Sequence, residues 1–367
     1  MMKSEFKTAI VFAVIIVAAI GMITVVLSAI DESQSSIMAG NMQDGQIDKS
    51  KFKTAPDLVG IAHHINITPE ELAAKMEGKV ILYDIWTYSC INCIRTLPHI
   101  TAWDDKYADE GLLIIGIHSP EFEFEKELTN VQTAVDKHGI AYPVVMDNDM
   151  ETWKAFENRY WPRKYIADHE GYIRYDHIGE GAYKETEMII QKLLQERAAA
   201  LGVQAASAVP LVDIDEFEHT SFRTPELYFG YKFAFGRSQL GSSEGFSPGK
   251  VVSYMEPKDV EMHKFYPIGT WKNTPDNMKL ESDDGVIKLR YSAKQVNIVT
   301  GNNADIEILL DGKPLPAEYA GSDVKNGMLT VNEPGLYNII DRDSASSHLL
   351  ELNIKGKGFE MFTFTFG

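Results

Sequence analysis

The chain has 367 residues, which is enough for two domains of roughly 150 residues each. Its 35 Lys and Arg residues and 53 Asp and Glu residues give a formal net charge of −18, which argues against a nucleic-acid partner. Apolar residues make up 44% and charged residues 24%, a globular composition that excludes a largely disordered chain.

An uncharged, apolar stretch lies near the N-terminus, at residues 9–30. A helix needs about 20 such residues to cross a bilayer core of about 30 Å, so the stretch predicts one transmembrane anchor in the cell membrane. Lysines precede it and acidic residues follow it, which predicts cytoplasmic residues 1–8 and an extracytoplasmic remainder. A cleaved signal peptide is the alternative, but its apolar core is usually about 7–15 residues long. Residues 31–54 are polar and aperiodic, so we expect a flexible tether.

Residues 55–202 alternate short apolar runs with amphipathic stretches. Strands separated by helices indicate βαβ units, and a closing hairpin at Gly171 makes the predicted central sheet mixed. We expect the acidic stretch at 121–127 to be a solvated helix face. The predicted elements, in chain order, are a helix from residue 69 capped by Thr68, a strand at 79–86, a helix at 94–107, a strand at 112–118, a helix at 124–138, a strand at 142–146, a helix at 150–160, strands at 164–167 and 172–177, and a helix at 186–201.

The only two cysteines, Cys90 and Cys93, lie between a predicted buried strand and the helix that follows it. Two cysteines at this spacing across a helix start can close a disulfide with little backbone movement. Unpaired backbone N–H groups and the positive end of the helix dipole favour a thiolate at Cys90, which we expect to be the attacking sulfur. Cys93 lies one turn inside the helix and is expected to resolve the mixed disulfide.

Two alternatives to a redox-active pair remain. A structural disulfide that closes so short a loop would add little stability. A zinc site would need further ligands, for which His63, His64 and His99 are the candidates near the cysteines in the sequence. Redox chemistry is therefore the favoured interpretation of the pair.

The segment DIWTYSCINC at residues 84–93, followed by Pro98, resembles the active-site segment of thioredoxin-like proteins. Trp161-Pro162 comes just before a predicted strand, where the resemblance implies a cis-proline that faces the disulfide. The insert after the strand at 112–118 is similar to that of membrane-anchored TlpA/ResA-type proteins. The stretches WTYSCINC, YWPRKYIADHEG and GEGAYKETE resemble more closely the extracytoplasmic region of DipZ-type proteins.

This resemblance implies an α/β thioredoxin-like fold over roughly residues 55–202, and thiol–disulfide exchange with protein partners without a cofactor or metal. Asp84 would lie on a buried strand beneath the cysteines, where burial raises the pKa of its carboxyl group and lets it exchange a proton with Cys93. A hydrogen-bonded structural carboxylate is the alternative for Asp84. Trp86, Trp161 and Pro162 are expected to line the substrate site, although a role in the core is equally open for Trp86.

A thiol peroxidase is a lesser alternative. Peroxiredoxins carry a threonine three residues before the reactive cysteine and a proline seven before it. Thr87 fits the first position, but Tyr83 occupies the second. A second cysteine three residues after the first is the arrangement of an oxidoreductase, so peroxidase activity is the weaker interpretation.

Residues 203–210 read as a linker, and residues 211–367 contain short apolar runs separated by turn signals. This pattern predicts an all-β jelly-roll sandwich, and the region resembles the carbohydrate-binding-module-like C-terminal part of DipZ-type proteins. Exposed Tyr228, Tyr231 or Trp271 could stack on a sugar, but core packing is the favoured role of each. The predicted strands lie at 251–254, 285–291, 296–300, 306–310, 328–331, 337–340, 348–354 and 360–366.

The sequence thus predicts a membrane-anchored extracytoplasmic thiol–disulfide oxidoreductase in which Cys90 and Cys93 form the redox-active disulfide. DipZ-type proteins carry a multi-helix membrane electron-transfer domain, whereas this sequence has one predicted anchor, so a separate membrane electron donor or acceptor is expected. The alternative from another class is a cell-surface glycan- or protein-binding module with a vestigial thioredoxin-like domain.

Overall fold

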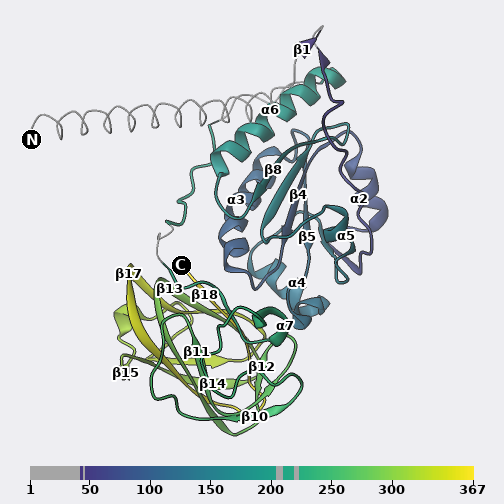
Figure 1. Cartoon of the computed structure of the whole chain (residues 1–367). Helices are drawn as coiled ribbons and strands as arrows, with labels where there is room; N and C mark the ends of the chain where they lie inside the picture. The colour runs from purple at the N-terminus through teal and green to yellow at the C-terminus, as the bar shows by residue number, and fades with distance from the viewer. Residues whose placement is uncertain (1–41, 44–45, 204–209, 219–222) are drawn as a thin grey trace, which may run out of the picture.

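The structure is a computed structural model, which describes residues 42–43, 46–203, 210–218 and 223–367. The anchor predicted at residues 9–30 lies outside these ranges. Within them, no helix is both long enough and apolar enough to cross a bilayer. Figure 1 shows two bodies, an α/β domain and an all-β domain. They are preceded by a two-stranded ribbon of β1 (Met42–Gln43) and β2 (Gln46–Ile47).

The α/β domain is built on a six-stranded mixed sheet with the order β3-β6-β5-β4-β7-β8. β4 pairs in parallel with β5, and β5 with β6, whereas β3, β7 and β8 pair antiparallel with their neighbours. The mixed sheet predicted from the sequence is therefore confirmed. Its strands are β3 (His63–Ile65), β4 (Val80–Trp86), β5 (Leu112–His118), β6 (Val144–Met146), β7 (Arg163–Ala167) and β8 (Ile173–Ile178).

Helices cover both faces of this sheet. They are α2 (Pro69–Met76), α3 (Ile91–Tyr107), the 3₁₀ turn η1 (Glu123–Lys126), α4 (Leu128–Lys137), α5 (Glu151–Ala155) and α6 (Tyr183–Leu201).

Side chains alternate along a strand, so the two faces of β4 contribute to different core clusters. One face carries Val80, Leu82 and Trp86, which pack with α3 and α6. The other face carries Ile81 and Tyr83, which pack with α2 and α5. Asp84 belongs to the first face and so lies on the α3 side.

Three predictions of local structure in this domain are corrected. The helix predicted at 124–138 is interrupted at Glu127, which has an extended backbone between η1 and α4. The helix predicted at 150–160 ends at Ala155, because Glu157 adopts a positive φ of 52° that an α-helix cannot accommodate. Residues 49–54, which were expected to belong to the tether, pack on the α/β domain. Lys49 forms an ion pair with Asp168, and the Lys53 carbonyl accepts a hydrogen bond from a backbone N–H group of β8.

The all-β domain contains strands that all pair antiparallel. Its elements are β9 (Leu227–Tyr228), α7 (Tyr231–Ala234), β10 (Val251–Tyr254), β11 (Phe265–Asn273), β12 (Met278–Leu280), β13 (Asp284–Gly301), β14 (Ala304–Leu310), β15 (Lys313–Pro314), the 3₁₀ turn η2 (Ala317–Tyr319), β16 (Met328–Val331), β17 (Gly335–Lys355) and β18 (Glu360–Phe366).

Two of these strands are far longer than the sequence pattern predicted. The strands expected at 285–291 and 296–300 are one strand, β13, and those expected at 337–340 and 348–354 are one strand, β17. Register shifts between β13 and β17 at Ala293–Gln295 and at Val296–Asn297 let the pair bend without ending. A polar interruption in the pattern therefore marks a bulge and not a turn.

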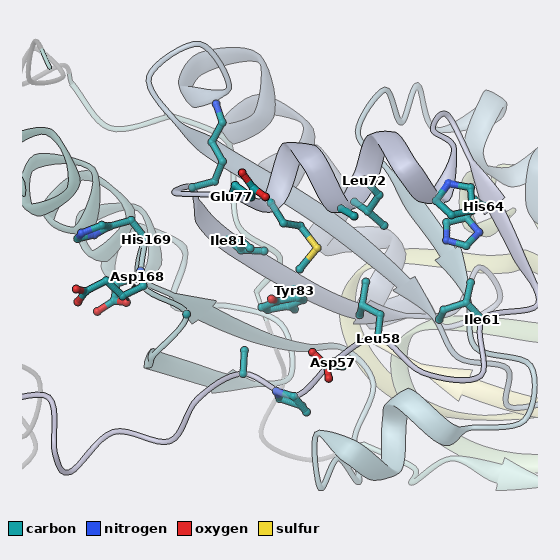
Figure 2. A pocket seen from close by; sticks show the side chains of 18 residues that line it. Asp57, Leu58, Ile61, His64, Leu72, Glu77, Ile81, Tyr83, Asp168 and His169 are labelled. Atoms are coloured by element: carbon teal, nitrogen blue, oxygen red, sulfur yellow. Dashed lines mark hydrogen bonds between the residues drawn. The ribbon is translucent and has the colours of Figure 1, made fainter. Parts of the chain in front are cut away.

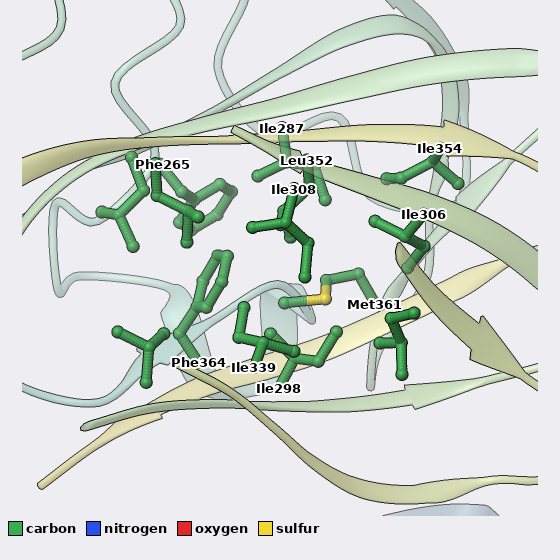
Figure 3. Close-up of a cluster of buried hydrophobic side chains, with 14 of the residues drawn as sticks. Phe265, Ile287, Ile298, Ile306, Ile308, Ile339, Leu352, Ile354, Met361 and Phe364 are labelled. Atoms are coloured by element: carbon green, nitrogen blue, oxygen red, sulfur yellow. The ribbon is translucent and has the colours of Figure 1, made fainter. Parts of the chain in front are cut away.

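The strands of this domain enclose an apolar core (Figure 3). Ile287 and Ile298 of β13, Ile308 of β14, and Met361 and Phe364 of β18 meet there, and all are inaccessible to solvent. Trp271 is also fully buried in this core, and Tyr228 is 7% exposed. Core packing, the favoured role for these two aromatic residues, is therefore confirmed.

An aromatic cluster joins the two domains. Phe122, which precedes η1 of the α/β domain, and Phe124 within η1 contact Phe362 of β18 at ring-centroid distances of 5.0 and 4.7 Å, and Phe122 also meets Phe233 of α7 at 5.8 Å. Tyr228 donates a hydrogen bond of 2.8 Å across the junction to Glu121. Figure 1 shows α4 and α7 at this junction. The shared core fixes the all-β domain against the edge of the sheet where β4 and β5 end.

The chain between the domains also packs on the α/β domain. The Val212 amide donates a 2.8 Å bond to Glu187 of α6, and Phe217 lies under the guanidinium group of Arg95 at 3.5 Å. Residues 211–218 form no helix or strand. The all-β fold thus begins after the boundary expected at residue 211, with β9.

Phe122→Ala is expected to weaken the junction, because it removes a buried ring that contacts two aromatic residues of the other domain. A large-to-small change at such a position costs about 3 kcal/mol. Calorimetry should show the thermal transition shifting downward and separating into two steps. Phe235→Ala is the matched control, since this ring is 78% exposed. An unchanged single transition in Phe122→Ala would contradict the coupling.

Candidate active site

Cys90 is the N-cap residue of α3. Its backbone is extended, and its sulfur accepts a hydrogen bond of 3.3 Å from the N–H group of Cys93. The helix starts at the next residue because the buried strand β4 ends at Trp86 and a short turn, closed by the bond from the Cys90 amide to the Thr87 carbonyl, reverses the chain. The first cysteine therefore faces the unpaired N–H groups of a helix start, as the sequence predicted.

The two sulfurs have different surroundings. Both cysteines are free thiols, and Cys90 is partly exposed whereas Cys93 is 1% exposed. Burial, together with the neighbouring Cys90 sulfur, raises the pKa of the Cys93 thiol well above its ordinary value. Cys93 is thus held as a protonated, shielded thiol next to a reachable one. This is the asymmetry expected of an attacking and a resolving cysteine.

Asp84 lies beneath the pair on β4 and is 1% exposed. Burial raises the pKa of its carboxyl group from an ordinary value of 3.8 to about 6, and the opposing charge of Lys164 limits the rise. Its Oδ1 atom has no hydrogen-bond partner among the described residues. The negative charge of Asp84 also contributes to the raised pKa of Cys93. The alternative of a fully hydrogen-bonded structural carboxylate is not supported.

Lys164 is a site residue that our sequence analysis missed. It faces Asp84 directly in the register of β7 against β4, and it is fully buried. Its Nζ atom donates a 3.2 Å bond to the Gly179 carbonyl, and burial lowers the pKa of the amine while the charges of Asp84 and Cys93 oppose that shift. The available signal was a lysine inside an otherwise buried strand, which requires a partner charge.

The Trp161–Pro162 peptide bond is cis, as the resemblance implied. Pro162 directly precedes β7, and Arg163 is in register with Ile85 near the end of β4, so the proline lies at the edge of the sheet from which the cysteine segment leaves. The Trp161 ring is partly exposed and packs against Trp153 in a tilted arrangement, with ring centroids 4.2 Å apart, and its Nε1 atom donates a 2.9 Å bond to the Ser119 carbonyl.

Trp86 and Thr87 point into the protein. Trp86 is fully buried and meets His118 edge-on at 5.4 Å, which favours the core role that the sequence left open. The Thr87 hydroxyl lies 3.3 Å from the His118 ring nitrogen Nε2, and burial lowers the pKa of that imidazole to about 3. Thr87 is thus engaged with a neutral, buried histidine.

A buried carboxylate holds the turn before Cys90. The Ser89 hydroxyl donates a 2.5 Å bond to Glu125 of η1, and the second oxygen of Glu125 accepts the backbone N–H groups of Glu121 and Phe122. Glu125 is fully buried, so the expectation of a uniformly solvated face at 121–127 is wrong there. The same 3₁₀ turn therefore fixes the cysteine segment and carries the aromatic residues that dock the all-β domain.

Of the histidines considered as zinc ligands, His63 and His64 lie on the edge strand β3, separated from β4 by β6 and β5, and His99 lies on α3. His99 stacks on Tyr183 at 3.5 Å, and His64 lines a cavity of about 660 Å³ under α2, on the opposite face of β4 (Figure 2). Ile81 and Tyr83, which face away from Asp84, form part of its floor. In the described ranges, no three His, Cys, Asp or Glu side chains are arranged to hold a metal ion.

Comparison with known proteins gives two domain matches. Residues 53–176 match the AhpC/TSA family, and residues 224–367 match a family described as thioredoxin like C-terminal domain. Protein DipZ of Mycobacterium bovis is 33% identical over 330 residues, which cover 89% of this chain and 45% of DipZ. The chain thus spans less than half the length of DipZ.

Two shorter relatives match the α/β domain. Thiol-disulfide oxidoreductase YkuV of Bacillus subtilis is 29% identical over 143 residues, which cover 38% of this chain and 94% of YkuV. Thiol-disulfide oxidoreductase ResA of Halalkalibacterium halodurans is 28% identical over 121 residues, which cover 33% of this chain and 64% of ResA. The family resemblance seen in the sequence is confirmed, and the α/β domain has a thioredoxin-like fold.

Asp84→Asn is expected to change how stability depends on pH. A carboxyl group with a raised pKa in the folded state stabilises the fold below its unfolded pKa, and that contribution is lost as the pH rises through about 6. The shift in pKa corresponds to roughly 3 kcal/mol. As the pH rises from below 3.8 to neutral, the free energy of unfolding of the variant should therefore rise by about that much relative to that of the wild type. Chemical denaturation at both pH values measures it, and parallel curves for the two proteins would refute the burial of an ionising Asp84.

Lys164→Met is expected to raise the pKa of Asp84 further, because the lysine charge is the interaction that opposes the effect of burial. Infrared spectroscopy of the carboxyl band, assigned by its loss in Asp84→Asn, measures the titration directly. Lys184→Met is the control, since Lys184 is exposed on α6. An Asp84 titration that is the same in both lysine variants would show that the two charges are not coupled.

Proposed function

We propose that the protein is a thiol–disulfide oxidoreductase that acts through Cys90 and Cys93 on protein substrates. The premise is that the chain joins a thioredoxin-like AhpC/TSA-family domain to a thioredoxin like C-terminal domain and is homologous to DipZ, YkuV and ResA. The observation that carries the proposal is the pair itself. A partly exposed sulfur caps a helix, and a buried thiol one turn away donates its backbone N–H group to that sulfur.

In the reductive direction, the Cys90 thiolate attacks one sulfur of a partner disulfide. A bond forms between Cys90 and that sulfur, the partner disulfide breaks, and the departing sulfur leaves as a thiolate that takes up a proton. Cys93 then loses its proton and attacks the Cys90 sulfur, which releases the second partner thiol and leaves the Cys90–Cys93 disulfide. Two electrons pass to the partner, and the oxidative direction is the reverse.

The second step needs a base, because burial keeps Cys93 protonated. Asp84 is the proposed proton acceptor, since its pKa of about 6 lets it hold either protonation state near neutral pH. Lys164 is a positioning residue that acts through Asp84: its charge keeps part of the carboxylate ionised despite full burial. Proton transfer between Cys93 and Asp84 would then accompany resolution of the mixed disulfide.

Trp161 and Pro162 are proposed to contact the substrate. The cis-proline cannot donate a backbone hydrogen bond, and the partly exposed indole of Trp161 is anchored by the Ser119 carbonyl. Trp86, which the sequence also suggested for this role, supports the site from within the core. The substrate surface therefore consists of Cys90 and the Trp161–Pro162 turn.

The proposed location is the outer side of the cell membrane, with residues 9–30 as a single anchor and the N-terminus in the cytoplasm. The apolar stretch and the charges around it support this placement, as does the homology to DipZ. A separate membrane protein would supply or accept electrons. The all-β domain is proposed to be a jelly-roll sandwich, and residues 203–210 the first part of the linker before it.

The two alternatives receive less support. A sugar-binding role for Trp271 or Tyr228 would need exposed rings, but both are buried, and of the three aromatic residues considered Tyr231 alone is partly exposed. A peroxidase would use the Thr87 hydroxyl at the reactive sulfur, whereas this hydroxyl contacts His118 in the interior.

Cys93→Ser is expected to trap protein partners on Cys90, because the mixed disulfide forms but cannot be resolved. Non-reducing electrophoresis followed by mass spectrometry detects the adducts, and a reductant should release them. Cys90→Ser and the double variant are the controls and should trap none. Equal trapping by Cys90→Ser, or none by Cys93→Ser, would contradict the assigned roles.

A further inference from the structure

A groove with a volume of about 660 Å³ lies between the two domains, next to the cysteine segment. Tyr88 and Ile91, on either side of Ser89 and Cys90, line it from the α/β domain, and the facing wall comes from β13 and β17 of the all-β domain. The volume lies in the range of clefts that enclose ligands, about 300–1,000 Å³. One wall of a groove beside the cysteine segment is therefore made by the other domain.

The position of this wall is fixed at the inner end of the groove. Arg95, two residues after Cys93 on α3, donates a 2.6 Å bond to Gln295 of β13, and its guanidinium group stacks on Phe217. The guanidinium group and Gln295 also enclose the C-terminal Gly367, where an added Cβ atom would lie within about 3 Å of both. Together with the aromatic cluster around Phe122, these contacts leave a slot whose walls cannot separate without breaking a buried junction.

The groove carries an unmet hydrogen-bond donor. Asn297 of β13 lines it and is fully buried, and its Oδ1 atom accepts a 2.8 Å bond from Asn338. That bond occupies the Oδ1 side of the Asn297 amide, and the Nδ2 group has no partner among the described residues. A buried unpaired N–H₂ group costs free energy unless a ligand carbonyl accepts from it. Tyr88, Ile91 and Tyr337 add aromatic and apolar surface along the same groove.

We propose that this interdomain groove binds an extended polypeptide segment of the redox partner and so delivers the partner's sulfur to Cys90. The inference rests on the proposed function, and it adds the class of substrate: unfolded or extended chains, not the surfaces of folded proteins. An extended chain presents a carbonyl acceptor at every residue for Asn297 and fits a slot between two fixed walls. A glycan offers hydroxyl groups to such a donor but has no sulfur to exchange, so the neighbouring cysteine pair favours the polypeptide.

Gly335→Trp tests the groove by filling it. Gly335 lies on the groove wall at the start of β17, outside the left-handed region of φ, and a Cβ atom there would meet no other atom within 4 Å. A second blocking variant, Thr133→Trp, fills the groove from exposed α4 on the opposite wall. Lys313→Trp, on exposed β15 outside the groove, is the matched control. None of the three positions belongs to the redox machinery.

The measurement compares kcat/KM for two disulfides, an unstructured peptide that contains one disulfide and hydroxyethyl disulfide, which is too small to need the groove. Both blocking variants should lose at least about tenfold on the peptide, equivalent to about 1.4 kcal/mol of transition-state binding, and remain within about twofold of wild type on the small disulfide. Lys313→Trp should match wild type on both. A folded protein with a surface disulfide should be a poor substrate of the wild type.

These outcomes distinguish failure of the proposed function from failure of the groove inference. If the wild type exchanges with neither disulfide, the proposed function fails and this inference fails with it. If the wild type exchanges with both but the blocking variants behave like Lys313→Trp, or the folded protein reacts as fast as the peptide, the groove inference alone is wrong. It is also overturned if an oligosaccharide binds the wild type, Gly335→Trp abolishes that binding, and peptide exchange is unaffected.

Discussion

The candidate site depends on one constraint: a strand buried along its whole length must place a carboxylate beneath a sulfur that itself stays reachable. All seven residues of β4 are buried, and alternation puts Asp84 on the face covered by α3. The turn that follows delivers Cys90 to the first N–H groups of α3, so its sulfur receives a hydrogen bond at the surface while Cys93 remains inside. The difference in exposure between the two sulfurs is thus a consequence of strand burial and helix geometry.

That burial would be costly without a partner charge. Lys164 supplies it from the neighbouring strand, where the antiparallel register sets the lysine opposite Asp84. The two groups moderate each other: burial favours the neutral form of both, and each charge favours the ionised form of the other. These opposing effects leave the pKa of Asp84 at about 6, as the proposed acid–base assistance to Cys93 requires.

The sequence predicted the parts of this site that are local in the chain. The spacing of Cys90 and Cys93, the buried strand before them and the helix after them are short-range signals, and the resemblance supplied the cis bond at Pro162. Lys164 and Glu125 were missed because their roles arise from contacts across the fold: Lys164 from the register of β7 on β4, and Glu125 from the docking of η1 onto Ser89. The continuity of β13 was missed for a related reason, since only the pairing with β17 reveals that a polar interruption is a bulge.

The most direct test of the central claim is an equilibrium redox titration of the wild-type protein in glutathione or dithiothreitol buffers, with thiol alkylation and mass spectrometry as the readout. The account predicts a single two-electron transition between about −120 and −270 mV that converts both thiols to a Cys90–Cys93 disulfide, with Cys90 alkylated faster than Cys93 in the reduced protein. Two independent one-thiol reactions, faster alkylation of Cys93, or the lack of any disulfide across that range would contradict it.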